Sequence, residues 1–193
     1  MTYNKDIYEF WRDHALEHIK PRVGGEFPEG WDVRDLLVEL IGDETVNEVG
    51  CGFGRLAGKF NPGLYHGWDI CPSAIEEAHI HEPLHTFRLY ELGHGLIPST
   101  WVLFYTTLLH VHDDDVPGFL KETTSKCRKV LIGEILGRNW RRKGNPPVFN
   151  REESEYIDVM KDAGFAFTSS RDIPYKRYGK GVNVSFMVFE RCY

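Results

Sequence analysis

A glycine-rich turn that directly follows a short β-branched run is the feature that most constrains this chain. Residues 46–60 read VNEVGCGFGRLAGKF, so Glu48, Gly50, Gly52 and Gly54 recur at every second position as the run ends. A strand that turns through glycines into a helix offers free amide N–H groups at the positive end of that helix, suited to a carboxylate or phosphate. Since glycine turns also occur without ligands, the turn alone predicts an anion-binding loop and no particular ligand.

An acidic residue at the end of the next expected strand narrows the choice of ligand. Asp69 ends the segment LYHGWD and stands 19 residues after Gly50. At such a position a carboxylate can accept hydrogen bonds from both hydroxyls of a ribose. Asp69 alone would also suit a helix N-terminus, but together with the loop it favours a ligand that contains adenosine.

The glycines also match a second motif. Gly52, Gly54 and Ala57 also satisfy the dinucleotide fingerprint GxGxxG/A, with Asp69 at the ribose position, which would indicate an NAD(P)-dependent oxidoreductase. That registration leaves Glu48 without a role. It also predicts parallel strands at the end of the chain, where we expect a hairpin.

Strand and helix patterns alternate along most of the chain. Strands are expected near residues 45–49, 64–69, 85–90, 101–106, 129–135, 166–173 and 182–190. This alternation predicts a Rossmann-like three-layer α/β sandwich with a mostly parallel seven-stranded sheet, because parallel neighbours need crossover connections. The last two strands are joined by a turn without room for a helix, so the C-terminal strand should run antiparallel.

Capping residues predict where several helices begin. The expected starts are at Asp32, at Ser73 with Glu76, at Asp113, Asp114 and Asp115 with Pro117, and at Asn150 with Glu153. A further helix should follow the glycine turn. We expect a single domain of residues 1–193, in which an aromatic N-terminal helix and loop (1–31) precede the Rossmann-like core (32–193).

Composition excludes several classes of protein. A net charge of −6 argues against a general nucleic-acid binder, and the longest nearly apolar run, residues 101–111, is too short to cross a membrane. The N-terminus lacks the apolar stretch of a secretory signal, so a cytoplasmic location is expected. The four cysteines form no C-x-x-C pair and should be reduced thiols, most of them buried.

Clusters of histidines and aspartates do not make a convincing metal site. Pro83 interrupts helical spacing among His79, His81 and His85. The three consecutive aspartates, 113–115, point in different directions and suit a helix N-terminus. We therefore expect no metal.

These motifs resemble those of the class I S-adenosylmethionine-dependent methyltransferases, in particular of their small-molecule branch. The resemblance covers about residues 32–190. EVGCGFGRL matches the family's acidic glycine signature, and DICPSAIEEA resembles its second motif. TTLLHVHDDDVPGFLKE resembles the stretch after the fourth strand, KVLIGEIL the fifth strand, and DAGF followed by VNVSFMVFER the closing helix and hairpin.

The resemblance implies a cofactor, S-adenosylmethionine, with S-adenosylhomocysteine as product. It places the methionine end of the cofactor at the loop, the ribose at Asp69 and the adenine against Ile70, with Glu91 nearby. The cofactor residues it implies are Glu48, Gly50, Cys51, Gly52, Gly54, Asp69, Ile70, Glu91 and Tyr105. The chain departs from the family at Thr100, where an acidic residue often begins the fourth strand.

Methyl transfer from a sulfonium needs alignment, exclusion of water and, for some acceptors, a base. Candidate catalytic residues at the carboxyl edge of the sheet are His110 and Glu134, followed by His112 and Tyr105. His110 would equally serve as a packed pocket residue, and Glu134 would equally pair with a loop arginine.

Two segments are candidates for binding the acceptor. Residues 138–147, RNWRRKGNPP, gather cations around a tryptophan and would form either a lid for an anionic acceptor or a solvated loop. N-terminal aromatic residues would form either an aromatic wall or simple packing. The candidate acceptor residues are Tyr3, Trp11, His110, Arg138, Trp140 and Arg141, with Tyr8 and Trp31 as further aromatic candidates.

The sequence thus favours a methyltransferase that acts on oxygen or nitrogen of a small, anionic or aromatic metabolite. An NAD(P)-dependent oxidoreductase and a non-catalytic S-adenosylmethionine-binding regulatory protein are the alternatives. The acceptor and the oligomeric state stay open.

Overall fold

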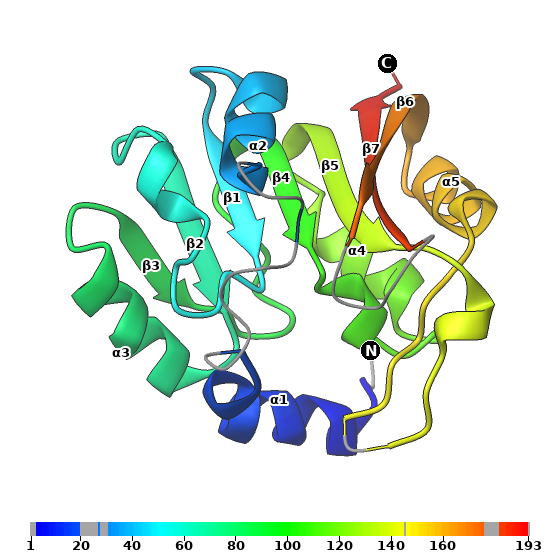
Figure 1. The fold of residues 1–193 in the computed structure, drawn as a ribbon, viewed down its shortest axis with the longest axis horizontal. Helices are drawn as coiled ribbons and strands as arrows, with labels where there is room; N and C mark the ends of the chain where they lie inside the picture. Colours follow the sequence, from blue (N-terminus) through cyan, green and yellow to red (C-terminus); the bar gives the residue numbers. More distant parts are fainter. Residues whose placement is uncertain (1–2, 20–26, 28–30, 145, 176–181, 193) are drawn as a thin grey trace.

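The computed structural model describes residues 3–19, 27, 31–144, 146–175 and 182–192. Its centre is one seven-stranded sheet in the order β3-β2-β1-β4-β5-β7-β6 (Figure 1). The strands are β1 (Val46–Val49), β2 (Tyr65–Asp69), β3 (Thr86–Leu89), β4 (Ser99–Tyr105), β5 (Cys127–Ile135), β6 (Phe165–Pro174) and β7 (Asn183–Arg191). All seven expected strands are present, with small shifts at their ends.

The direction of the strands confirms the expected fold class. Strand β1 pairs in parallel with both β2 and β4, and β4 pairs in parallel with β5. Strand β7 runs antiparallel between β5 and β6, as the short final connection predicts. The strand order reverses between β1 and β4, and in open α/β sheets ligands bind at the carboxyl ends of the strands at such a switch point.

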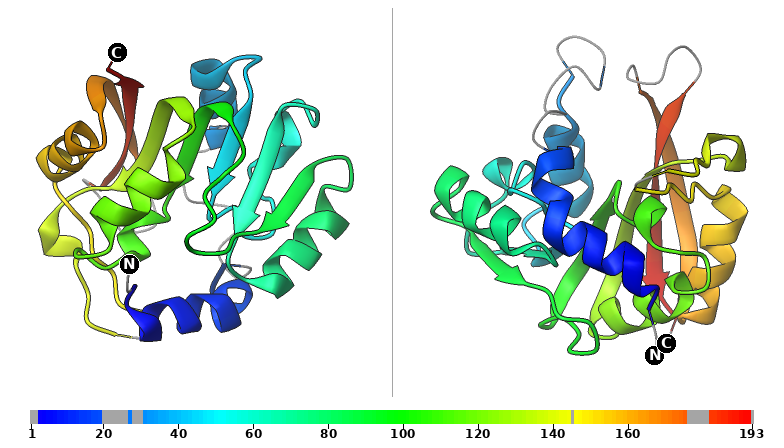
Figure 2. Two further views of the ribbon diagram at one scale, coloured as in Figure 1. Left: turned by 180° about the vertical axis from the view of Figure 1, so that it is seen from behind. Right: turned by 90° about the horizontal axis from the view of Figure 1, so that it is seen from below.

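Helices cover both faces of the sheet (Figure 2). The α-helices of the described residues are α1 (Lys5–Ile19), α2 (Val33–Ile41), α3 (Pro72–His81), α4 (Val116–Thr123) and α5 (Glu153–Asp162). Residues of α2 and α3 join one buried apolar cluster, and residues of α4 and α5 join a second cluster on the other face. Alternating residues of the strands supply both clusters; Val46 and Val49 of β1, for example, belong to different ones.

Helix α1 crosses the carboxyl ends of the central strands and does not belong to either face layer (Figures 1 and 2). Its first turn is anchored at Asn4, whose N–H donates to the Asp115 carboxylate at 2.9 Å. The predicted N-terminal helix is therefore present, and it lies over the edge where a ligand is expected. The predicted loop at residues 21–30 lies outside the described residues, apart from Phe27.

One predicted helix is absent from its place. No α-helix follows the glycine turn, where the chain forms only the short 3₁₀ helix η2 (Ala57–Lys59). Phe60 already has extended backbone, and the Asn61-Pro62-Gly63 turn then leads into β2. The chain between β1 and β2 is thus too short and too strongly turned for a helix, so amide groups of the loop itself must provide any anion site.

The expected helix caps are only partly correct. Asp32 caps α2, because its carboxylate accepts the N–H of Arg34 at 2.9 Å. The capping box predicted at Ser73 and Glu76 is wrong: Cys71 holds the cap position of α3 without a side-chain cap bond. The start of α5 is likewise shifted from Asn150 to Glu152, whose capping box uses Glu155. The aspartates before α4 also make no side-chain cap bond. At Asn150 and Asp115 a bond to another element competes for the expected cap, because Asn150 donates to the Ile135 carbonyl and Asp115 accepts from the N–H of Asn4.

The structure also shows the state of the cysteines and the surroundings of the other clusters that the sequence singled out. All four cysteines are free, and Cys192 is the exposed one. Among the described residues no cluster of three potential metal ligands occurs, and none of the helices there has the length and apolar character to span a membrane.

Candidate functional site

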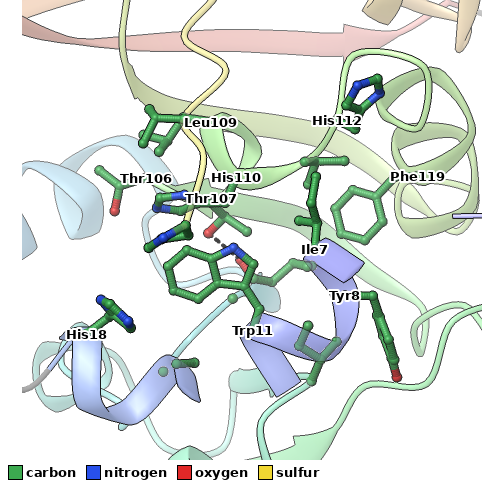
Figure 3. Close-up of a pocket in the computed structure, with 18 of the residues that line it drawn as sticks. Ile7, Tyr8, Trp11, His18, Thr106, Thr107, Leu109, His110, His112 and Phe119 are labelled. Atoms are coloured by element: carbon green, nitrogen blue, oxygen red, sulfur yellow. Dashed lines mark hydrogen bonds between the residues drawn. The ribbon is translucent and has the colours of Figure 1, made fainter. Parts of the chain in front are cut away.

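A cavity of about 580 Å³ opens at the carboxyl ends of β1, β2 and β4, beneath α1 (Figure 3). Its lining comes from the glycine turn, the ends of β2 and β4, the segment after β4, helix α1 and the connection from β5 to α5. Such a volume suits a cofactor-sized ligand. The cavity lies where the sheet order reverses, as the sequence predicts for a ligand.

The glycines of the turn are required mainly by the protein's own packing. Gly50 and Gly54 have positive φ angles of 78° and 79°. A Cβ on Gly50 would lie 2.5 Å from Thr107 Oγ1, and one on Gly54 would lie 2.7 Å from Phe87. Gly50, Cys51 and Gly52 line the cavity and Gly54 does not. Gly54, a cofactor residue implied by the resemblance, thus leaves space for the Phe87 ring and not for a ligand of the cavity.

Asp69 lines the cavity and is 6% exposed. One carboxylate oxygen accepts the N–H of Gly52 at 2.8 Å, and the other accepts the N–H of Cys71 at 2.9 Å. These bonds tie the glycine turn to the end of β2. Burial raises the pKa of Asp69, while the N–H donors oppose that shift. Each carboxylate oxygen has further acceptor capacity, so the position is compatible with ribose hydroxyls.

Glu48 does not line the cavity. Its side chain is buried within the sheet layer and accepts a hydrogen bond from the Tyr65 hydroxyl. Burial raises the pKa of Glu48 to about 7. The alternation of β1 explains its place, because Glu48 points to the cluster that contains Val46 and away from Val49, a cavity residue. Glu48 therefore packs on the face of β1 that is turned away from the cavity.

The residues near the predicted adenine position are only partly those expected. Ile70 lines the cavity. Glu91 does not: its side chain is 61% exposed and pairs with His94 at 2.9 Å. Tyr90 and Leu92, on either side of Glu91, line the cavity instead. The segment singled out from the sequence therefore reaches the cavity, but through Tyr90 and Leu92, because the Glu91 side chain faces solvent.

A cation inside the glycine turn was not singled out from the sequence. Arg55 lines the cavity, its guanidinium lies 4.8 Å from the centre of the Tyr105 ring, and it donates to Thr106 Oγ1 at 3.1 Å. Thr106 has a φ of 52°, which is rare for a β-branched residue. Such strain is commonly found at binding sites. The one available signal was the arginine directly after Gly54.

The opposite wall is built from aromatic and imidazole rings. Trp11 of α1 faces His110, with ring centres 4.2 Å apart (Figure 3). Tyr3 also lines the cavity, and its hydroxyl donates to Glu122 at 3.0 Å. Tyr8 and His18 complete this wall, whereas Trp31 is not part of the lining and packs on Phe27. The cavity thus brings together Tyr3, Trp11 and His110, as the sequence predicts.

Glu134 is not part of the cavity lining. It is fully buried, and its Oε1 accepts the N–H groups of Leu108 and Leu109 at 2.7 and 3.4 Å. These donors lie at the start of the 3₁₀ helix η3 (Leu108–His110). Burial raises the pKa of Glu134 to about 8. A direct role as catalytic base does not fit this position, because the carboxylate cannot reach a ligand in the cavity.

In the basic segment, residues 138–147, some cations form ion pairs within the protein and others line the cavity. Arg138, in the 3₁₀ helix η4 (Arg138–Trp140), is 60% exposed and pairs with Glu155. Arg141 binds both oxygens of Asp113, at 2.7 and 3.1 Å. Neither arginine lines the cavity, so the structure does not place them where the sequence expected an acceptor to bind. The cavity lining from this segment includes Trp140, Arg142 and Lys143.

Comparison with known proteins identifies the fold. No protein-family model and no curated protein matches the sequence. Among solved structures, magnesium protoporphyrin IX methyltransferase from Synechocystis PCC 6803, with bound S-adenosylmethionine, superposes with a TM-score of 0.75 at 15% identity over 100% of both chains.

Two further structures support the same assignment. The 1,6-didemethyltoxoflavin-N1-methyltransferase from Burkholderia thailandensis, with its named substrate and S-adenosylhomocysteine bound, has a TM-score of 0.76 at 16% identity, covering 100% of this chain and 92% of its own. A methyltransferase from Methanosarcina mazei has a TM-score of 0.62 at 14% identity, covering 80% and 96%. The chain therefore has the Rossmann-like fold of the class I S-adenosylmethionine-dependent methyltransferases.

Proposed function

We propose that this protein is an S-adenosylmethionine-dependent methyltransferase that acts on oxygen or nitrogen of a small aromatic, anionic metabolite. The observation that carries the proposal is the cavity at the switch point of the sheet, which is lined both by the glycine turn and by Asp69. The antiparallel β7 favours this reading over an NAD(P)-dependent oxidoreductase, whose sheet we expect to end in parallel strands.

The residues at the carboxyl ends of β1 and β2 fit the proposed cofactor. Asp69 suits the ribose, and Ile70 with Leu92 offers apolar contact to a base. Arg55 is the cation of this half of the cavity, and we assign it to the carboxylate of the methionine moiety. Glu48 and Gly54 have supporting roles, because neither lines the cavity.

The chain's own residues would align the acceptor and receive its proton. When bound, the sulfonium supplies an activated methyl group. His110 is the base we propose, because its ring lies in the cavity wall and imidazole exchanges protons near neutral pH. Trp11 holds the acceptor ring beside His110, and α1 shields the reacting atoms from water.

The charge of the cavity supports an anionic acceptor. Arg142 and Lys143 line its wall near Trp140. Of the carboxylates in the lining, Asp69 is bound by two backbone N–H groups and Asp115 by the N–H of Asn4. The cations of the lining would attract a carboxylate or phosphate, and the aromatic residues would pack on a flat ring. The Burkholderia neighbour, named for N-methylation of a small molecule, agrees with this substrate class.

The proposal is tested by methyl transfer from radiolabelled S-adenosylmethionine to a panel of phenolic, aromatic carboxylic and N-heterocyclic acids. We expect transfer to at least one anionic aromatic acceptor. His110→Gln should lower turnover about 10²-fold or more, the usual contribution of a general base. His94→Gln, a change of an exposed histidine outside the cavity, is the matched control. Cofactor binding without transfer to any acceptor would favour a non-catalytic regulatory protein.

A further inference from the structure

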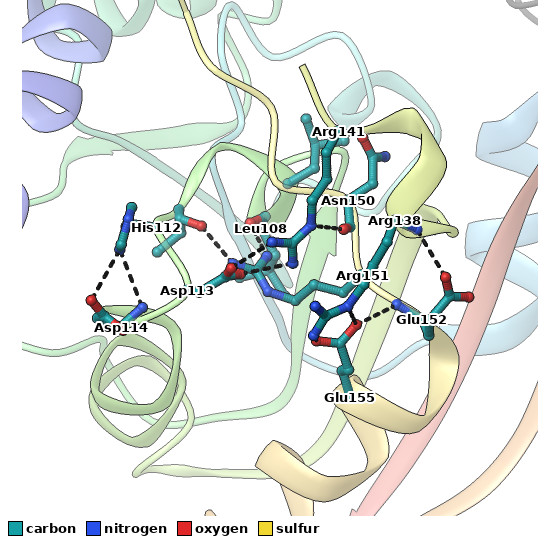
Figure 4. Close-up of polar contacts among 12 residues, drawn as sticks. Leu108, His112, Asp113, Asp114, Arg138, Arg141, Asn150, Arg151, Glu152 and Glu155 are labelled. Carbon is teal, nitrogen blue, oxygen red and sulfur yellow. Dashed lines mark hydrogen bonds and ion pairs between the residues drawn. The ribbon is translucent and has the colours of Figure 1, made fainter. Parts of the chain in front are cut away.

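One short segment of the cavity wall is held by buried charged side chains. We call residues 107–113 the histidine segment, because it carries His110 and His112; Figure 4 shows its Leu108, His112 and Asp113 beside Arg151. The main chain of Leu108 is bound on both sides: its N–H donates to Glu134 at 2.7 Å, and its carbonyl accepts from Arg151 at 2.8 Å. The first residue of η3 is therefore fixed by two buried polar side chains, Glu134 from β5 and Arg151 from the segment before α5.

Arg151 also fixes the far end of the histidine segment. Its second terminal nitrogen donates to the Val111 carbonyl at 2.7 Å and pairs with Asp113 at 2.8 Å. The Arg151 side chain is only 4% exposed. Arg141 binds the same aspartate, and the N–H of Phe149 donates to the Leu109 carbonyl at 2.7 Å. The Arg151 guanidinium thus binds the carbonyl of Leu108, the first residue of η3, and the carbonyl of Val111, which directly follows η3.

His110 lies between these two fixed points. Its N–H donates to the Thr107 carbonyl at 3.0 Å, and its ring packs on Trp11. Because the turn is only three residues long, a shift of Leu108 or Val111 moves the His110 ring relative to Trp11. The buried charges therefore act on the cavity through the main chain.

Burying the ionisable groups of Glu134 and Arg151 costs free energy. Burying a guanidinium costs several kcal/mol, burying the Glu134 carboxyl raises its pKa, and well-packed apolar residues often stabilise a core as well. Within the described residues, Glu134 Oε2 has no hydrogen-bond partner although it is buried. Stability alone does not account for this arrangement, whereas a requirement for exact placement of the turn does.

We propose that Glu134 and Arg151 are positioning residues that set the place of the His110 ring in the cavity. The proposal rests on the proposed function only in that His110 receives the acceptor's proton. Neither residue contacts the cavity; each acts through the main chain of the histidine segment.

The surroundings of Glu134 allow a conservative test. Arg151 precedes α5 and Tyr156 lies on it; Ser185 of β7 stands opposite Glu134 in the sheet register, with Asp172 of β6 beyond it. The pKa of Glu134 is raised to about 8 by burial, so its ionisation falls in an accessible range. Glu134→Gln keeps the size and one acceptor oxygen but removes this titration.

The experiment follows the Cε1–H NMR signal of His110 as a function of pH in the full-length protein, assigned by its loss in His110→Asn. In the wild type we expect a second inflection near pH 8, in addition to the titration of the imidazole itself. Glu134→Gln should abolish that inflection. Arg151→Met should reduce the ring-current shift that Trp11 imposes on the signal. Arg171→Met, which breaks an exposed ion pair with Glu39, is the matched control and should leave the signal unchanged.

The outcomes separate this inference from the proposed function. Wild-type His110 signals in both Glu134→Gln and Arg151→Met would overturn the positioning role. If Arg151→Met does not fold, the pH profile of Glu134→Gln decides alone. S-adenosylhomocysteine is titrated in parallel, and its affinity should stay within about twofold in Glu134→Gln. Absence of binding to the wild type, with a His110 signal that still depends on Glu134, would reject the cofactor and keep the positioning role.

Discussion

The two halves of the cavity are built in different ways. The half that we assign to the cofactor consists largely of main chain from two neighbouring strand ends, tied together where Asp69 accepts the N–H groups of Gly52 and Cys71. The half that we assign to the acceptor consists of side chains from α1, the histidine segment and the β5–α5 connection. The first half is set by the sheet, whereas the second depends on contacts between segments far apart in sequence.

This difference indicates where a site of this kind can change. In the cofactor half, the main chain at the sheet edge constrains the ligand. In the acceptor half, we expect side chains to be exchangeable without a change in the sheet. Glu134 and Arg151 lie behind the acceptor half, where they join the end of β5 and the segment before α5 to the turn that carries His110.

The largest effect is expected where the two halves touch. Gly50→Ala would place a Cβ 2.5 Å from Thr107 Oγ1 at a φ of 78°. A left-handed alanine costs about 1–2 kcal/mol and overpacking about 1–3 kcal/mol more, so we expect a total loss of about 3 kcal/mol in the free energy of unfolding. Chemical denaturation measures it.

Gly93→Ala is the control for that substitution. Gly93 also has a positive φ, 91°, but a Cβ there would meet nothing within 4 Å. It should lose only the backbone contribution, about 1–2 kcal/mol. Equal losses in the two variants would show that the contact between Gly50 and Thr107 is unimportant.

A smaller effect is expected in the cofactor half alone. Asp69→Ala removes the carboxylate that we assign to the ribose and should weaken binding of S-adenosylhomocysteine by about 1–3 kcal/mol. Glu91→Gln should leave the affinity unchanged, because that side chain is exposed and outside the cavity. Isothermal titration calorimetry compares the two. If Glu91→Gln weakened binding and Asp69→Ala did not, the adenosine would have to lie near Glu91 and not near Asp69.

The last predicted effect is a slope, and it concerns the pH dependence of stability. Burial raises the pKa of Glu134 from 4.5 to about 8, so the folded protein binds more protons than the unfolded chain between these values. The free energy of unfolding should therefore fall as pH rises through this window. Glu134→Gln should flatten the slope by up to about 1.4 kcal/mol per pH unit. Denaturation curves from about pH 5 to pH 9 test this, and an unchanged slope would contradict the raised pKa.

The sequence predicted the sheet and the edge at which the cavity lies, for physical reasons. Strand periodicity, the glycine turn and the position of Asp69 are local signals, and parallel topology then brings them to one edge. The lining opposite that edge could be predicted only in part. Trp11 and His110 line the cavity, whereas Arg138, Arg141 and Glu134 do not, because they bind Glu155, Asp113 and the main chain of Leu108 instead. Such pairings join distant segments and leave no periodic trace in the sequence.

The missed helix has a similar cause. The glycine turn predicted a helix after it, yet buried Leu56 and Ala57 anchor the chain within the turn and the Asn61-Pro62-Gly63 turn follows at once. Arg55 was overlooked because its partners, Tyr105 and Thr106, come from β4 and the residue after it.

The central claim is that the cavity holds the adenosyl cofactor, and calorimetric titration tests it most directly. S-adenosylhomocysteine should bind one site with a dissociation constant in the micromolar range, about −8 kcal/mol, and NAD and NADP should produce no heat of binding. Binding of NAD or NADP without binding of S-adenosylhomocysteine would contradict the assignment.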